Sequence, residues 1–210
     1  MCAAKFESPV SHLLHWAHIK PNEVYLTQPI ADQVIEYTWS EVLYEVSCVA
    51  RYLDKYPKGS HIAIISLNCA HWIMADLAIQ MAGHVSIPIY PTASKQTIEK
   101  ILQHSAAKAV FLGKMFEPDR APGLLPAGYD QMALYQAYPN TPFWQELVDA
   151  NEPIAERANN HANDLVSIIY TSGTTGDPKG VMIAYRAIQA SMELVKSVIL
   201  INQKDRFVSY

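Results

Sequence analysis

The chain has 210 residues, half of them hydrophobic, which is enough to bury a core in one large domain or two small ones. Charged residues make up 17% and the formal net charge is −4, so we expect no nucleic-acid partner. The start of the chain, MCAAKFESPV, has no apolar secretory signal, and the aliphatic runs are too short to span a bilayer. The sequence therefore predicts a cytoplasmic protein.

A β-hairpin followed by an amphipathic helix is predicted in the first part of the chain. Residues 24–39 contain two short apolar stretches around an Ala-Asp-Gln turn, which is typical of paired strands. Thr38 and Glu41 form a capping box that can satisfy the first free amides of a helix. We expect this helix to end near Pro57. Its apolar residues recur at helical spacing and predict one buried stripe: Val42, Val46, Val49, Ala50 and Leu53.

Strands and helices then alternate. Apolar stretches at 61–66, 85–90 and 107–113 predict three strands, and the helices between them are predicted to be capped by Asn68 and Ser94. This alternation predicts an α/β fold with a mostly parallel sheet that helices cover on both faces. In such sheets, ligands bind beyond the carboxyl ends of the strands.

The composition divides the chain into three parts. Residues 1–116 form the predicted N-terminal α/β subdomain. Residues 117–163, rich in proline, form a connecting region with one short strand near Gln131 and one helix near Phe143. Residues 164–210 begin a second α/β subdomain, in which we expect two strands around a polar loop, a helix from Arg186 and a further strand at RFVSY, residues 206–210.

The polar loop, YTSGTTGDPKG at residues 170–180, has the chemistry of a phosphate-binding site. Its glycines permit positive φ angles and close approach of an anion, and successive amides in such turns converge on anions. Lys179 adds a positive charge. A Walker A loop is excluded, because that motif places Ser or Thr after the lysine and opens a helix. The loop's hydroxyl donors and glycines are Thr171, Ser172, Thr174 and Thr175, with Gly173, Gly176 and Gly180.

The stretch YTSGTTGDPKGVM resembles the phosphate-loop signature of the adenylate-forming enzymes, which include acyl-CoA synthetases, luciferases and the adenylation domains of peptide synthetases. Three upstream stretches, YTWSEV, IISLNCAHW and AGHVSIPIYPT, resemble the N-terminal region of that family in the same order. The resemblance implies that the chain is part of the large N-terminal domain of such an enzyme.

This resemblance also implies a reaction, in which a carboxylate attacks the α-phosphate of ATP. The products are an acyl-adenylate and pyrophosphate, and the thiol of coenzyme A then displaces AMP. Lys179 would stabilise the phosphate charge and is the one catalytic group implied in this segment, while the hydroxyl of Thr171 would reach Mg²⁺. The residues implied in binding the ATP phosphates are Thr171, Ser172, Gly173, Thr174, Thr175, Gly176 and Lys179.

The substrate is suggested by IYPTASKQTIEKIL, residues 89–102, which resembles the fatty-acyl members of the family. Amino-acid adenylation domains tend to have Asp-Pro-x-Tyr-Pro there. The resemblance therefore favours a fatty acid–CoA ligase, whose lipid substrate would bring it into peripheral contact with a membrane. Two positions depart from the family pattern: Ala184-Tyr185-Arg186-Ala187 replaces Thr/Ser-His-Arg-Asn, and His84 replaces a small residue beside a strand.

Several working parts of the family have no counterpart in the sequence, among them a Tyr-Gly-x-Thr-Glu stretch and the lysine of a mobile C-terminal domain. We therefore expect the chain to be the N-terminal portion of an acyl-CoA synthetase, inactive by itself. Two alternatives stay open: a non-catalytic nucleotide-binding module, and an adenylating enzyme for an aryl acid or an amino acid.

Two other groups of residues could form chemical sites but have simpler explanations. Three histidines at spacings of three could hold a metal, yet a helix turns beyond one face over that distance, so surface histidines are favoured: His12, His15 and His18. Three cysteines without a Cys-x-x-Cys pair favour reduced thiols, with the second and third packed in the core: Cys2, Cys48 and Cys69.

Overall fold

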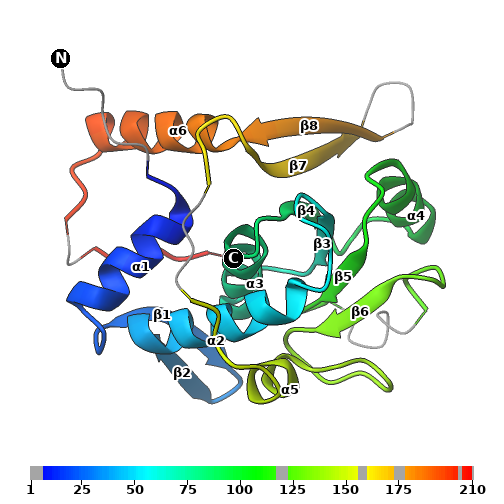
Figure 1. The fold of residues 1–210 in the computed structure, drawn as a ribbon, viewed down its shortest axis with the longest axis horizontal. Helices are drawn as coiled ribbons and strands as arrows, with labels where there is room; N and C mark the ends of the chain where they lie inside the picture. The colour runs from blue at the N-terminus through cyan, green and yellow to red at the C-terminus, as the bar shows by residue number, and fades with distance from the viewer. Residues whose placement is uncertain (1–6, 117–122, 156–159, 173–177, 203–204, 210) are drawn as a thin grey trace.

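The structure is a computed structural model that describes residues 7–116, 123–155, 160–172, 178–202 and 205–209 (Figure 1). In chain order, its elements are α1 (Pro9–Ile19), β1 (Val24–Ile30), β2 (Gln33–Thr38), α2 (Trp39–Leu53), β3 (His61–Ile65), α3 (Ala70–Met81), β4 (Val85–Ile89), α4 (Lys95–His104), β5 (Ala109–Leu112), β6 (Asp130–Ala133), α5 (Trp144–Asp149), β7 (Leu165–Ser172), β8 (Pro178–Ala184) and α6 (Tyr185–Val198).

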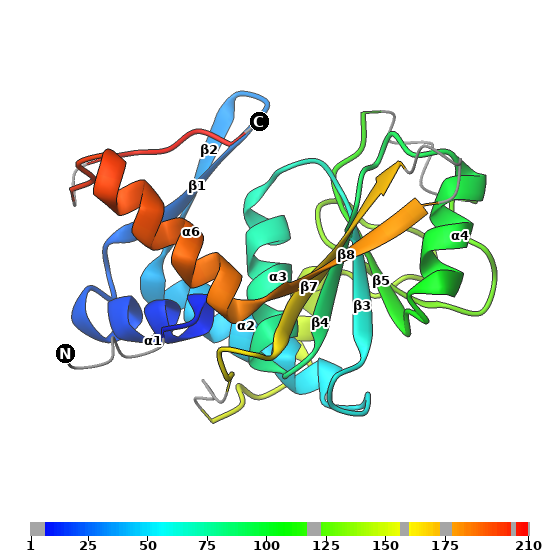
Figure 2. The ribbon, with the colours of Figure 1, turned by 90° about the horizontal axis from the view of Figure 1, so that it is seen from above.

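A six-stranded sheet with the order β6-β5-β3-β4-β7-β8 forms the centre of the molecule. All of its neighbouring strands are parallel except β7 and β8, which form an antiparallel hairpin at one side. Helices α2 and α3 lie on one face of the sheet and α4 on the other (Figure 2). The predicted α/β fold with a mostly parallel sheet is therefore confirmed.

Two apolar clusters, one on each face of the sheet, make up the core. Successive residues of a strand point to opposite faces, so β3 contributes to both clusters. Ile62 and Ile64 pack with α2 and α3, whereas Ala63 and Ile65 pack with α4. Burial on both faces explains why this strand is a continuous apolar run rather than an alternating one.

The predicted capping box at the start of α2 is present. The hydroxyl of Thr38 accepts a hydrogen bond from the Glu41 amide at 3.3 Å, and the Glu41 carboxylate accepts one from the Thr38 amide at 2.7 Å. The apolar stripe behind it is buried as predicted. Helix α2 ends at Leu53, four residues before Pro57, with Asp54 at its C-cap.

We expect the capping box to lose its contribution to stability in acid. The hydrogen bonds from Thr38 hold the pKa of Glu41 below its usual value. A carboxylate with a lowered folded-state pKa contributes stability above its unfolded pKa, about 4.3, and loses it as the pH falls through the folded value. Glu41 is close to solvent, so we expect its ionised carboxylate to contribute only about 0.5 kcal/mol to the free energy of unfolding.

Denaturant unfolding of the wild type and of Glu41→Gln from neutral pH to about pH 3 tests this expectation. Glutamine keeps the length and an acceptor oxygen but does not titrate. The wild type should be the more stable protein at neutral pH, and the difference should narrow in acid. A difference that stays constant across this range would contradict the assignment.

Asn68 does not cap α3, contrary to the prediction. The N-cap residue is Cys69, whose side chain makes no capping hydrogen bond. The Ala70 amide instead donates to the side-chain oxygen of Gln28 on β1 at 2.8 Å, and Asn68 donates to Ser209. A side chain on a strand distant in sequence therefore accepts the hydrogen bond of the first amide of α3. A local capping pattern cannot reveal such a partner.

The predicted strand at residues 206–210 was also wrong, as far as the structure describes it. Residues 205–209 have no regular secondary structure, and Tyr210 lies outside the described residues. The side chains of Phe207 and Val208 are 76% and 86% exposed. Apolar, β-branched composition favours a strand, but a strand forms only where a neighbour accepts its hydrogen bonds.

In residues 117–163, the predicted strand and helix are present as β6 and α5. Trp144 at the start of α5 is buried against the α2 and α3 face, and its indole N–H donates to Glu45 at 2.7 Å. Across the part of the chain that the structure describes, no helix has the length and apolar character needed to cross a bilayer.

Candidate active site

The described residues of the polar loop, 170–172 and 178–180, belong to the two strands of the β7–β8 hairpin. In its register, Tyr170 lies opposite Gly180, Thr171 opposite Lys179 and Ser172 opposite Pro178. Four of the predicted phosphate-binding residues lie outside the described residues: Gly173, Thr174, Thr175 and Gly176. What the structure places is therefore the base of the loop, with its two strands held in register.

The hairpin sets Thr171 and Lys179 beside each other. Directly opposed residues of an antiparallel pair have their side chains on the same face, with Cβ atoms about 4.5–5.5 Å apart. Both residues are exposed. The side chains of Thr171 and Lys179 therefore leave the same face of the hairpin from neighbouring positions, where the loop leaves the sheet. Lys179 belongs to a strand rather than to the start of a helix, which confirms that this is not a Walker A loop.

This pair lies at the carboxyl end of the parallel sheet. Strand β7 runs parallel to β4, so Thr171 is at the same end as Ile89, the last residue of β4. A small cleft of about 80 Å³ lies there and is lined by Thr171, Pro178 and Tyr90, among others. The carboxyl end is where parallel α/β sheets bind ligands, and the hairpin adds a hydroxyl and a cation to it.

Gly180 differs from its predicted conformation. The glycines with positive φ among the described residues do not include it, so its backbone is ordinary extended strand. A Cβ atom at this position would lie 2.8 Å from Cγ2 of Ile168 and 3.1 Å from Cζ of Tyr170. Glycine is therefore required here by the side chains of the facing strand, and not by backbone conformation.

A hydrogen bond that the sequence analysis missed ties this hairpin to α4. The hydroxyl of Tyr170 lies 2.7 Å from Nδ1 of His104, the last residue of α4. Burial raises the pKa of Tyr170, so the hydroxyl keeps its proton. The tautomer of His104 sets whether that hydroxyl donates to Nδ1 or accepts from it. The alternation of buried Ile168 and Tyr170 with exposed Ile169 and Thr171 is the signal in the sequence that could have placed this tyrosine inside.

The other candidates behave as their simpler explanations predict. Two of the three histidines that were predicted to lie at the surface, His15 and His18, are exposed on α1. Among the described residues, no group of three or more His, Cys, Asp or Glu side chains could hold a metal ion. Cys48 and Cys69 are buried free thiols, and burial raises the pKa of both, which disfavours a reactive thiolate. Cys2 lies outside the described residues.

Comparisons with known proteins identify the family of the chain. Residues 13–210 match the family model described as AMP-binding enzyme. Long chain acyl-CoA synthetase 1 of Arabidopsis thaliana is 26% identical over 195 residues, which cover 86% of this chain and 29% of that protein. A component of the linear gramicidin synthase of Brevibacillus parabrevis is 30% identical over 192 residues, which cover 86% of this chain and 3% of that protein.

A solved structure with a similar fold is O-succinylbenzoate coenzyme A synthetase from Bacillus subtilis, in complex with AMP. It superposes with a TM-score of 0.72 at 23% identity and covers 95% of this chain and 48% of that one. The chain spans less than a third of the length of the two curated relatives. Because the family model matches nearly all of its residues, and its sheet and polar hairpin fit the same assignment, the chain belongs to the adenylate-forming family of AMP-binding enzymes.

Proposed function

We propose that the protein activates a carboxylic acid with ATP, forming an acyl-adenylate and releasing pyrophosphate. The observation that supports this most is the opposed pair of Thr171 and Lys179 at the base of a loop rich in hydroxyls and glycines. A carboxylate has no good leaving group, and adenylation supplies one. The departing pyrophosphate carries several negative charges, which backbone amides, hydroxyls and Lys179 would stabilise.

Magnesium fits this site through the phosphates rather than through a protein cage. Mg²⁺ prefers oxygen ligands and usually binds one or two protein groups together with phosphate oxygens and water. Thr171 is exposed beside Lys179, and its hydroxyl is the oxygen that this chain would contribute. When bound, the ion would neutralise phosphate charge, while Thr171 would orient the same phosphates by hydrogen bonding.

The acid is proposed to be a fatty acid, and coenzyme A the acceptor of the acyl group. Residues 89–102 support this, as do relatives named as long chain acyl-CoA synthetases. A lipid substrate would bring the protein into contact with a membrane surface, and we propose that it does so from the cytoplasm. An aryl acid or an amino acid is the second candidate, supported by relatives named as an O-succinylbenzoate synthetase and a linear gramicidin synthase.

We expect fatty acids to stimulate exchange of labelled pyrophosphate into ATP by the intact protein. The assay should compare a series of saturated fatty acids with benzoate-type acids and with amino acids, all at the same concentration. Stimulation by fatty acids alone supports the proposed substrate, and stimulation only by the other acids would replace it. MgATP binding without exchange for any acid would favour a non-catalytic nucleotide-binding module.

A further inference from the structure

One face of helix α4 lies against the base of the polar loop. Thr97, Ile101 and His104 are spaced four and three residues apart, so they share this face of the helix. The first two line the small cleft at the carboxyl end of the sheet, together with Tyr170 and Thr171. His104 lies at the end of the same face and reaches the hydroxyl of Tyr170. Helix α4 therefore forms one wall of the site to which the hairpin contributes its polar groups.

The side chain of Tyr170 is held from two sides. Its hydroxyl oxygen lies 2.7 Å from Nδ1 of His104, and the two rings meet edge to face, with centroids 5.7 Å apart and planes at 87°. A Cβ atom added to Gly180 would lie 3.1 Å from Cζ of Tyr170, so the phenol ring lies close against the backbone of β8. Tyr170 is 7% exposed and packs in the apolar cluster on the α4 face. The phenol therefore joins α4 to both strands of the hairpin.

The position of Tyr170 also determines where the proposed phosphate-binding groups lie. Thr171 is the next residue along β7, and its side chain leaves the opposite face of the strand. Lys179 pairs with Thr171 across the hairpin, so a displacement of Tyr170 would move both groups. Catalysis is sensitive to such displacements, because a misplacement of about 1 Å can lower a rate about 100-fold.

We propose that His104 is a positioning residue for the adenylation reaction and acts through the hydroxyl of Tyr170. This hydrogen bond would fix Thr171 and Lys179 in place while negative charge develops on the departing pyrophosphate. The inference rests on the proposed function. A positioning role requires a polar group at the place of Nδ1, and neither the charge nor the bulk of the ring can replace it. This requirement determines which variants test the proposal.

Steady-state kinetics of acid-dependent ATP–pyrophosphate exchange by the intact protein provide the first test, with rates expressed per folded molecule. His104 is exposed, so its replacement removes no core packing. We expect His104→Ala to lower kcat about tenfold and to change KM for ATP less than about threefold, because the lost interaction acts on the transition state. His104→Asn presents an amide near the place of Nδ1 and should restore most of this loss. In His104→Gln the amide lies one bond farther out, and kcat should resemble that of His104→Ala. Equal kcat in the asparagine and alanine variants would overturn the proposal.

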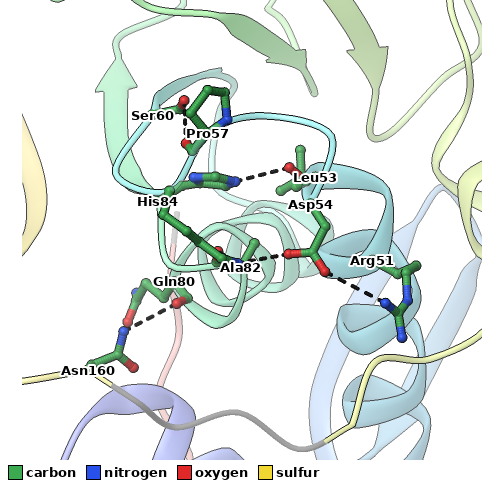
Figure 3. Close-up of polar contacts among 10 residues, drawn as sticks. Arg51, Leu53, Asp54, Pro57, Ser60, Gln80, Ala82, His84 and Asn160 are labelled. Carbon is green, nitrogen blue, oxygen red and sulfur yellow. Dashed lines mark hydrogen bonds and ion pairs between the residues drawn. The ribbon is translucent and has the colours of Figure 1, made fainter.

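His84→Ala is the matched control for the loss of a purely structural hydrogen bond. Nε2 of His84 lies 3.0 Å from the carbonyl oxygen of Leu53 (Figure 3), at the amino end of β4, whereas the loop base lies at the carboxyl end of the sheet. Alanine is small, as the family pattern is at this position, so the variant should fold. It should lower the free energy of unfolding in denaturant but leave kcat per folded molecule unchanged. If His104→Ala also leaves kcat unchanged, its role is structural and the proposal is wrong.

A double-mutant cycle with Tyr170→Phe shows whether His104 acts through the phenol hydroxyl. Phenylalanine keeps the ring and removes only the oxygen, so kcat should fall by about the same factor as in His104→Ala. The double variant should then be no slower than the slower single variant, whereas multiplied losses would mean that the two residues act separately and would refute the proposal. A wild type that exchanges pyrophosphate with no acid would remove the proposed function and this inference together. An active wild type with an unaffected His104→Ala would remove the inference alone.

Discussion

Replacement of Lys179 by alanine is expected to reduce acid-dependent ATP–pyrophosphate exchange by the intact protein by about 10²–10³-fold, the loss typical of one group that stabilises developing charge. The side chain stands opposite Thr171 at the base of the loop, and its charge is the part of the site that a neutral methyl group cannot replace. Because Lys179 is exposed, the free energy of unfolding should change by less than about 0.5 kcal/mol.

Two further variants make this prediction specific. Lys179→Arg keeps the charge but changes the shape of the head group, so it should retain part of the exchange activity. Lys108→Ala removes another exposed lysine, located just before β5 at the amino end of the sheet, and should leave exchange unchanged. If Lys179→Ala exchanges pyrophosphate at the wild-type rate, the loop has been assigned the wrong role.

Gly180→Ala is expected to destabilise the protein by about 1–3 kcal/mol, the usual cost of overpacking, and to lower exchange activity with it. The added methyl would lie 2.8 Å from Cγ2 of Ile168 and 3.1 Å from Cζ of Tyr170. At an extended strand position, alanine restricts the unfolded chain and gains about 0.4–1 kcal/mol, which is too little to offset this contact. Displacement of Tyr170 would also disturb Thr171, the next residue along the strand.

A double-mutant cycle separates this contact from a general effect of alanine. Ile168→Ala removes the methyl group that the new Cβ would strike, at its own cost as a core truncation. Gly180→Ala should therefore cost less in the Ile168→Ala background than in the wild type, with a coupling of about 0.5–3 kcal/mol measured by denaturant unfolding. Additive effects would mean that the steric explanation is wrong.

Elements whose signals are local could be predicted from the sequence. The capping box of Thr38 and Glu41, the apolar stripe of α2 and the buried run of β3 each follow from a pattern of residues that are close together in the sequence. The hairpin flanking the loop was predicted for the same reason, because both of its strands adjoin the polar stretch. How the described loop residues bind phosphate stays a prediction.

Contacts between distant segments could not be predicted in this way. Gln28 satisfies the start of α3, and His104 binds Tyr170, because the sheet brings together segments that the sequence separates by dozens of residues. His84 looked like a neutral replacement beside a strand, yet it is an internal residue hydrogen-bonded to the end of α2. Such pairings depend on which strands become neighbours, which no local pattern encodes.

The sequence alone determined the α/β class and the parallel sheet, and it predicts phosphate binding by residues 170–180, because periodicity, caps and glycine-hydroxyl composition are local properties. Only the tertiary structure decided that Thr171 faces Lys179 and that Gly180 must lack a side chain. Those facts depend on strand register and on packing between elements, which are settled only when the whole chain buries its apolar surface.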